Sequence, residues 1–216
     1  MRRPYGAARI ASAIVLDESL VAFVLASLPP APARVLEIGA GDGELAEHLR
    51  AQGYDVLAID PAADTPAVQK VALLDLEAPA ASFDAAIAVV SLHHVEPLAE
   101  SCEHLGELLR PGGTLVIDEF DMGRLDMRAA GWWAANRADG HEHRDLDDMV
   151  GHMKSHLHPL DTVVAALEPW FEFGETERLP YVYRWLRRPE LRQAEESEIA
   201  GNGLPATGAR VVARRR

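Results

Sequence analysis

The chain has 216 residues, 48% of them hydrophobic and 25% charged, which is typical of a globular protein with a substantial core. Its formal net charge of −13, from 34 acidic and 21 basic residues, disfavours nucleic acid as a partner. One cysteine, no recognisable signal peptide and no apolar run of about 18 residues together predict a cytoplasmic protein without an internal disulfide or a membrane partner.

Apolar residues recur at helical spacing between residues 9 and 28, which predicts a helix that a proline-rich segment ends. Strands and helices then alternate as far as residue 118. The predicted strands lie at 35–38, 55–59, within 68–74, and at 83–90 and 114–118, and the helices at 44–52 and 98–109. Nearly continuous apolar strands separated by helices indicate a parallel sheet that is buried on both faces.

The remainder of the chain has a different composition. Residues 119–158 contain two tryptophans, five of the nine histidines and many acids, and are predicted to form an inserted lid. Beyond the lid, a helix is expected at 160–167, a strand within 171–179, a helix at 189–199 and a last strand at 209–213. We therefore expect one α/β domain over residues 1–216, with the lid and an N-terminal helical segment, 1–30, capping the substrate side.

Glycines occupy every second position just after the first predicted strand, at 39, 41 and 43. Glycine tolerates positive φ and has no Cβ, so a ligand can lie against the backbone near a helix N-terminus. Asp60 ends the second strand, where its carboxylate can accept hydrogen bonds from both hydroxyls of a ribose. The carboxyl ends of strands are where open α/β sheets bind ligands, so a nucleoside-containing ligand is predicted here.

A dinucleotide such as NAD fits this turn less well. The dinucleotide fingerprint has its third glycine three positions after the second, and Glu44 stands there instead. A pyrophosphate beside Glu37, Asp42 and Glu44 would be repelled, whereas a ligand with a cationic centre and an amino acid end would not. The remaining alternative is a tight turn that binds nothing.

Five segments in order resemble the motifs of the class I S-adenosylmethionine-dependent methyltransferases. They are VLEIGAGDGELAEHL, VLAIDP, LLDLEAP, FDAAIAVVSLHHVEP and LGELLRPGGTLVIDEF, and the resemblance is close over residues 34–120. It implies a Rossmann-like, seven-stranded, mostly parallel sheet with an antiparallel last strand and helices on both faces. It also implies S-adenosyl-L-methionine as cofactor and S-adenosyl-L-homocysteine as product.

The resemblance further implies a set of cofactor-binding residues. Glu37 would help to hold the methionine amino group, Asp60 the ribose hydroxyls and Asp75 the adenine amino group, while Ser91 would lie near the reacting methyl. The full set is Glu37, Gly39, Ala40, Gly41, Gly43, Asp60, Pro61, Asp75, Leu76 and Ser91.

Candidates for the acceptor side are chosen by position and chemistry. His93 and His94 follow the fourth predicted strand, and either can serve as a general base, as can His141 in the lid. Similar methyltransferases with many different substrates carry two histidines here, so a non-catalytic role stays open. The candidate substrate residues are Glu119, Asp121, Trp132, Trp133 and His143. For the acids the alternative is solvation, and for the tryptophans it is core packing.

The histidines of the lid also suggest a metal site. His152 and His156 are four residues apart, so a helix would place them on one face, and acids at 142, 145 and 148 offer oxygen ligands. No cysteine and no known ligand signature accompany them, and no metal is expected.

The sequence thus predicts methyl transfer from S-adenosylmethionine to an O or N nucleophile of a small molecule, by a monomer or homodimer. Two alternatives remain, a methyltransferase acting on protein or RNA and a non-catalytic module of the same fold. A dehydrogenase is disfavoured by the glycine spacing.

Overall fold

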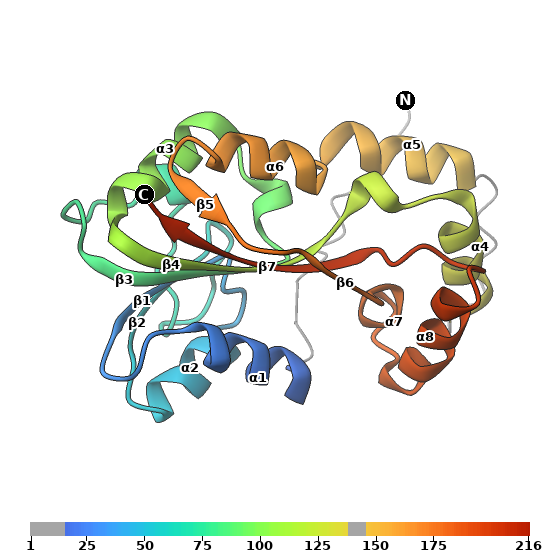
Figure 1. The fold of residues 1–216 in the computed structure, drawn as a ribbon, viewed down its shortest axis with the longest axis horizontal. Coiled ribbons are helices and arrows are strands. Elements are labelled where there is room, and N and C mark those ends of the chain that lie inside the picture. Colours follow the sequence, from blue (N-terminus) through green and yellow to red (C-terminus); the bar gives the residue numbers. More distant parts are fainter. Residues whose placement is uncertain (1–15, 138–145) are drawn as a thin grey trace.

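A computed structural model describes residues 16–137 and 146–216. Its centre is a seven-stranded sheet with the order β2-β1-β3-β4-β7-β5, and β6 also pairs with β7 (Figure 1). The strands are β1 (Arg34–Ile38), β2 (Asp55–Ile59), β3 (Phe83–Val89), β4 (Leu109–Phe120), β5 (Phe171–Phe173), β6 (Glu177–Leu179) and β7 (Gly208–Arg215). Only β7 runs against the others, because β1 to β4 are mutually parallel and β5 and β6 are antiparallel to β7. The predicted mostly parallel sheet with an antiparallel last strand is confirmed.

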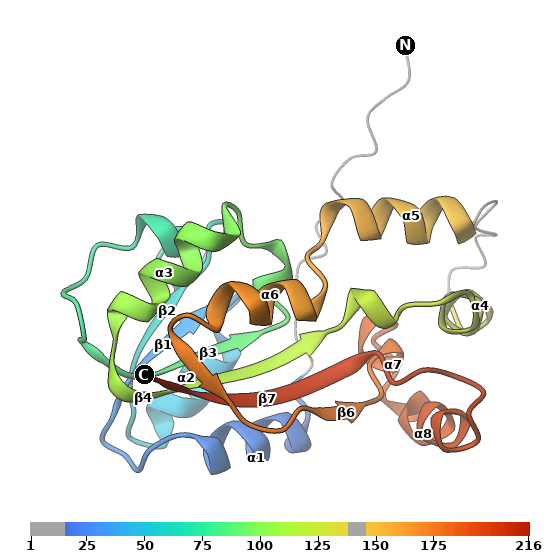
Figure 2. The ribbon, with the colours of Figure 1, turned by 45° about the horizontal axis from the view of Figure 1, so that its top comes forward.

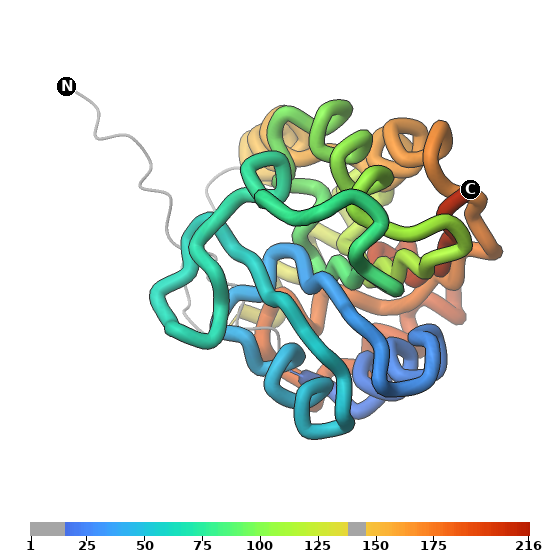
Figure 3. The backbone as a smooth tube through the Cα atoms, turned by 90° about the vertical axis from the view of Figure 1, so that its left-hand side faces the viewer, coloured from blue at the N-terminus to red at the C-terminus, as the bar shows by residue number. Residues whose placement is uncertain are grey.

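Helices cover both faces of this sheet, as Figures 1 and 3 show. Helices α1 (Glu18–Ser27) and α2 (Glu44–Ala51) lie on one face, and α3 (Leu98–Leu108) and α6 (Leu160–Leu167) on the other. Side chains alternate along a strand, so Val35 packs in the cluster beneath α1 and α2 while Leu36 packs in the cluster beneath α3. Burial on both faces explains why the strand sequences are almost continuously apolar.

Four more helices lie beyond the carboxyl end of β4 (Figure 2). They are α4 (Met127–Ala135) and α5 (Leu146–His156) of the lid, and α7 (Val182–Trp185) and α8 (Arg192–Ala200) of the C-terminal third. A separate apolar cluster joins the lid to α7 and includes Phe120, Met122, Val150 and Tyr181. The carboxyl end of the sheet therefore has its own small core. No helix in the described ranges has the length and apolarity that a bilayer crossing requires.

Several predicted elements differ from the structure. The described helix α1 begins at Glu18, where the Asp17 carboxylate accepts a hydrogen bond from the Leu20 N–H, and residues 9–15 lie outside the described ranges. The strand predicted within 68–74 is wrong, because only Gln69 bridges to β2 and the 3-10 helix Leu73–Asp75 follows. The strand predicted within 171–179 is two short strands, β5 and β6, and helix α7 was not predicted.

Candidate active site

The glycine turn joins β1 to α2 and is held against the neighbouring strands. The N–H groups of Gly39 and Ala40 both donate to the Ile59 carbonyl, at 2.8 and 3.0 Å. Gly39 has a φ of +70°, and a Cβ built on it would lie 2.4 Å from the Cβ of Ser91. Glycine is required here for both reasons, and the turn after β3 packs directly on the turn after β1.

Asp60 links the glycine turn to the end of β2. Its Oδ2 accepts from the Gly41 N–H at 3.0 Å and its Oδ1 from the Ala62 N–H at 2.7 Å. A carboxylate has about four lone-pair sites, so each oxygen keeps one for a ligand hydroxyl. The position and the remaining capacity fit the predicted contact with a ribose, while the neighbouring Pro61 is exposed.

Glu37 lies in β1, just before the turn, and only 2% of it is exposed. Its buried Oε2 has no hydrogen-bond partner among the described residues. Burial raises the pKa of Glu37 to about 8, although the positive charge of Arg50 opposes the shift. A buried carboxyl oxygen without a partner beside a bare backbone turn fits the cationic amino end of a ligand.

The other predicted cofactor residues extend this region in two directions. Ser91 is buried, its Oγ has no partner among the described residues, and it touches the glycine turn. Asp75 is exposed and Leu76 buried, and both line an open surface pocket formed by residues 74–79 and His104. The Nε2 of His104, which was not predicted, lies 3.0 Å from the Leu76 carbonyl. We call the glycine turn with Glu37, Asp60 and Ser91 the cofactor side.

Glu119 is the first correction to the predicted substrate residues. It is 1% exposed, so neither solvation nor a place at an open rim describes it. Its Oε1 accepts from the Ser91 and Leu92 N–H groups at 2.8 and 2.7 Å, and its Oε2 lies 2.6 Å from Nδ1 of His93 and 3.2 Å from the Phe120 N. The carboxylate is fully used in holding the turn after β3, so Glu119 is a buried structural group rather than a surface acid.

Asp121 is corrected in the same way. It is 6% exposed, its Oδ1 accepts from the Gly123 and Leu160 N–H groups at 3.1 and 3.4 Å, and its Oδ2 pairs with Arg178. The residue fixes the start of the lid and the start of α6. Both acids were predicted as surface groups because the sequence shows that they lie near the carboxyl end of a strand but not which partners bury them; Glu119 is within β4 and Asp121 just after it.

The two adjacent histidines differ in environment. His93 is 5% exposed and contacts Glu119, whereas His94 is exposed, with the two ring centroids 4.2 Å apart. Since Glu119 takes Nδ1 of His93, that nitrogen carries the proton, and no described residue bonds Nε2. Of the two, His93 therefore has the geometry of an oriented base.

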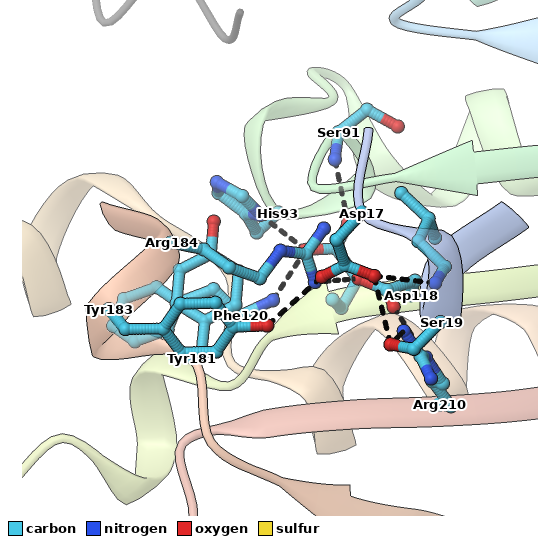
Figure 4. A network of polar contacts seen from close by, with 12 residues as sticks. Asp17, Ser19, Ser91, His93, Asp118, Phe120, Tyr181, Tyr183, Arg184 and Arg210 are labelled. Carbon is cyan, nitrogen blue, oxygen red and sulfur yellow. Dashed lines mark hydrogen bonds and ion pairs between the residues drawn. The ribbon is translucent and has the colours of Figure 1, made fainter. Parts of the chain in front are cut away.

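A buried ion-pair network adjoins this turn and was not predicted (Figure 4). Asp118 is 1% exposed, and its two oxygens contact Nη1 of Arg184 and Nε of Arg210, at 2.5 and 2.7 Å. Burial disfavours the charge of Arg184, but Asp118 outweighs this and raises the pKa of the guanidinium. The network reaches α1, because Nη2 of Arg210 donates to Oγ of Ser19 at 3.2 Å and Ser19 donates to Asp17 at 2.8 Å. The Tyr183 hydroxyl also donates to Asp17, at 3.0 Å.

Aromatic rings from the lid and from α7 form one cluster at the carboxyl end of β4. Trp133 is 8% exposed and stacks on Trp185 with ring centroids 4.7 Å apart, and Phe120 stacks on Tyr181 at the same distance. Trp132 is only partly buried. Trp133 thus belongs to the small core of the lid, whereas Tyr181 and Trp185 come from a segment where no element was predicted. We call the lid, α7, this cluster and the ion-pair network around Asp118 the acceptor side.

A second buried carboxylate holds α7 in place. Glu195 in α8 is 1% exposed and accepts hydrogen bonds from three successive N–H groups, those of Tyr181, Val182 and Tyr183, at 2.8, 2.9 and 2.7 Å. Burial raises the pKa of Glu195, and the three N–H groups oppose that shift. The N-terminus of this short helix is thereby capped from another helix.

The predicted histidine group of the lid is only partly described. His141, His143 and the acids at 142 and 145 lie outside the described ranges. The rings of His152 and His156 are tilted relative to each other with centroids 4.1 Å apart on an exposed part of α5, and His158 lies 2.9 Å from Glu96. Within the described residues no group of three or more metal-ligating side chains comes together.

Comparisons with known proteins agree with this geometry. A family model described as a methyltransferase domain matches residues 11–155, more than half of the chain. An uncharacterized methyltransferase of Mycobacterium tuberculosis is 33% identical over 100 residues, which cover 40% of this chain and 50% of that protein. A ubiquinone biosynthesis O-methyltransferase of Xanthomonas axonopodis pv. citri is 36% identical over 117 residues, which cover 46% of this chain and 48% of that protein.

The chain thus spans about half the length of these curated relatives. A solved structure of an S-adenosylmethionine dependent methyltransferase from Mesorhizobium loti has the same fold, with a TM-score of 0.58 and 22% identity. That match covers 89% of this chain and 95% of the other.

Proposed function

The chain belongs to the class I S-adenosylmethionine-dependent methyltransferases, and we propose that it methylates an O or N nucleophile of a small molecule. When bound, S-adenosylmethionine supplies an electrophilic methyl group on a sulfonium. The residues of the cofactor side are suited to hold it: Asp60 has oxygens for the ribose, and Glu37 has one for the amino end. Asp75 and Leu76 line an open pocket, which supports the proposal that they contact the adenine.

One observation carries the acceptor half of this proposal, the buried contact between Glu119 and Nδ1 of His93. Glu119 also bonds the N–H of Ser91, whose side chain packs on Gly39. An imidazole that is oriented by a carboxylate, on a turn that touches the cofactor side, is suited to general base catalysis. His93 Nε2 would take the proton from an acceptor hydroxyl or protonated amine, while the acceptor atom gains the methyl group.

The acceptor side supports a small organic acceptor. The aromatic rings of the lid and α7 form a packed apolar cluster at the carboxyl end of β4, which supports an organic acceptor, and the acidic surface disfavours RNA. The 36% identity with a ubiquinone biosynthesis O-methyltransferase supports an O nucleophile on a ring compound. We propose that residues 119–158 cap this side and exclude water from the reaction.

The first experiment tests cofactor identity. Calorimetry should show S-adenosylhomocysteine binding in the micromolar range and no binding of NAD. Binding of NAD without binding of S-adenosylhomocysteine would contradict the assignment of the cofactor side.

The second experiment tests the reaction and separates the alternatives. Labelled S-adenosylmethionine is incubated with phenols and amines, a protein extract and total RNA, and incorporation is counted in each. Label in small molecules supports the proposal, label in protein or RNA supports the first alternative, and no label with intact cofactor binding supports a non-catalytic module.

The role of His93 is tested with a matched histidine of the lid. His93→Ala should lower turnover by about 100-fold, the usual contribution of a general base, while His152→Ala on the exposed part of α5 should leave it unchanged. Equal activity of both variants would remove His93 from the reaction.

A further inference from the structure

A strained residue stands between the two sides of the site. Val90 follows β3 with a φ of +52°, in the left-handed region. Among the described residues outside glycine, three others have positive φ, namely Ala81, Arg187 and Asn202, and none of these has a branched Cβ. A β-branched side chain disfavours this conformation strongly, so the fold must hold it in place.

The contacts that hold the strained residue are all buried or in the sheet. The Val90 N–H donates to the Asp118 carbonyl at 2.8 Å and thus extends the pairing of β3 with β4. The next two N–H groups, of Ser91 and Leu92, donate to Glu119 at 2.8 and 2.7 Å. The chain therefore bends at Val90 between two segments that are both fixed by hydrogen bonds.

The bend at Val90 has two structural effects. It carries Ser91 onto the glycine turn, where Ser91 Cβ occupies the space that a Cβ on Gly39 would need. It also leaves the Val90 side chain half-buried, in contact with the core beneath the glycine turn and with the lid cluster. Glycine would adopt this backbone without strain, but it would lose the contacts that the Val90 side chain makes with the two apolar clusters.

We propose that Val90 is a positioning residue for the cofactor, because its side chain wedges the Ser91 turn against the glycine turn. The inference rests on the proposed function, since it assigns the glycine turn to the cofactor. Without the Val90 side chain, the turn after β3 retains its hydrogen bonds to Glu119, but its position beside Gly39 is no longer fixed. The methionine end of the ligand would then contact a turn, at Ser91, whose position varies.

The test compares Val90→Gly with Ala81→Gly, which relieves the same backbone conformation at the opposite end of β3. Ala81 is exposed, its N–H donates to the Glu107 carbonyl, and it lies far along the strand from the glycine turn. Binding of S-adenosylhomocysteine is measured by calorimetry, and melting by circular dichroism. Val90→Gly should weaken binding about tenfold with a melting temperature within about 3 °C of the unaltered chain, because relief of strain offsets the lost burial. Ala81→Gly should melt at the same or a higher temperature and bind the ligand normally.

Binding of Val90→Gly within twofold of the unaltered chain would overturn the proposal. If that variant unfolds, Val90→Ala replaces it, since alanine keeps a Cβ and loses only the wedge; binding weakened at least threefold supports the proposal, and unchanged binding overturns it. If the unaltered chain does not bind S-adenosylhomocysteine, the proposed function fails together with this inference. Equal binding by the unaltered chain and the variant contradicts the inference alone.

Discussion

The cofactor side and the acceptor side of the crevice are built differently. On the cofactor side, the backbone of the glycine turn meets the Asp60 carboxylate across only 19 residues of sequence. On the acceptor side, buried and half-buried side chains from distant segments meet: Asp118 and Arg210 are 92 residues apart, and Asp17 and Tyr183 are 166 apart. A local backbone site can be read from a short motif, whereas a site assembled from remote side chains cannot.

The same difference should appear in how each side responds to substitution. The cofactor side depends on the absence of side-chain atoms, so added atoms should damage it most. The acceptor side depends on buried charged groups that are fully bonded, so loss of one partner should damage it most. Four predictions test this contrast, in decreasing order of expected effect.

The largest effect is expected from Gly39→Ala. The new Cβ would lie 2.4 Å from the Ser91 Cβ at a φ of +70°, so overpacking adds to backbone strain, and unfolding should become easier by about 4 kcal/mol. Gly112→Ala is the control, because its φ is +75° and nothing lies within 4 Å of the added Cβ, and it should lose only about 1 kcal/mol. Urea unfolding of both variants gives the two values, and equal losses would show that backbone strain alone explains Gly39.

The second effect tests the acceptor side through Glu195→Ala. Three buried N–H groups lose their acceptor, so the free energy of unfolding should fall by about 2–3 kcal/mol. The control is the exposed neighbour Glu196, which pairs with Arg192. Glu196→Ala should lower the free energy of unfolding by less than about 0.5 kcal/mol. Affinity for S-adenosylhomocysteine should stay within twofold in both variants, and a parallel loss of affinity would show that the two sides are not independent.

The sequence predicted much of the fold because the relevant signals are local. Apolar runs, their alternation with helices and the glycine turn predicted β1 to β3, α2, α3 and α6 with small differences in their ends. The strand predicted at 114–118 is also present, but β4 is longer and begins at Leu109, which was predicted to be helical. The strand predicted within 68–74 failed, since a short apolar segment does not say whether an edge partner is available. Helix α7 has four residues and depends on Glu195 from another helix, so no local sequence pattern predicts it.

The candidate site divides in the same way. Gly39 and Asp60 meet their neighbours as the motif implies, although their contact with a cofactor stays a prediction. Glu119 and Asp121 were placed at the correct end of β4 but assigned an exposed role, because burial depends on remote partners such as Arg178. The networks around Arg184 and Glu195 had no detectable signal, since a single charged residue in a sequence does not show what it pairs with.

The third effect concerns affinity rather than folding. Asp60→Ala should weaken S-adenosylhomocysteine at least tenfold, about 1.4 kcal/mol, because two charge-assisted bonds to ribose hydroxyls are lost. Asp64→Ala, a nearby acid after the same strand, is the matched control and should bind normally. Calorimetry on both decides the question, and an unchanged dissociation constant for Asp60→Ala would remove that residue from the cofactor side.

The smallest effect concerns the one buried acid of the cofactor side, Glu37. Its pKa is raised to about 8 by burial, so the folded chain keeps a proton that the unfolded chain releases above its ordinary pKa of about 4.5. The contribution of Glu37 to the free energy of unfolding is therefore greatest at low pH. It falls as the pH rises towards 8, because in that range the unfolded chain binds fewer protons than the folded chain.

Between about pH 6 and pH 7 the loss should be about 1 kcal/mol in the unaltered chain. Glu37→Gln keeps the shape of the side chain but cannot ionise, so its unfolding free energy should lack this component, and the difference between the two proteins should change by about 1 kcal/mol over the same interval. Glu44→Gln, in the exposed first turn of α2, is measured beside it as a control for the loss of a carboxyl group. Urea unfolding in steps of half a pH unit measures the slopes. Parallel slopes for Glu37→Gln and the unaltered chain would mean that Glu37 is already ionised when folded; the cofactor side would then contain a buried carboxylate held as on the acceptor side, and the contrast between the two would be lost.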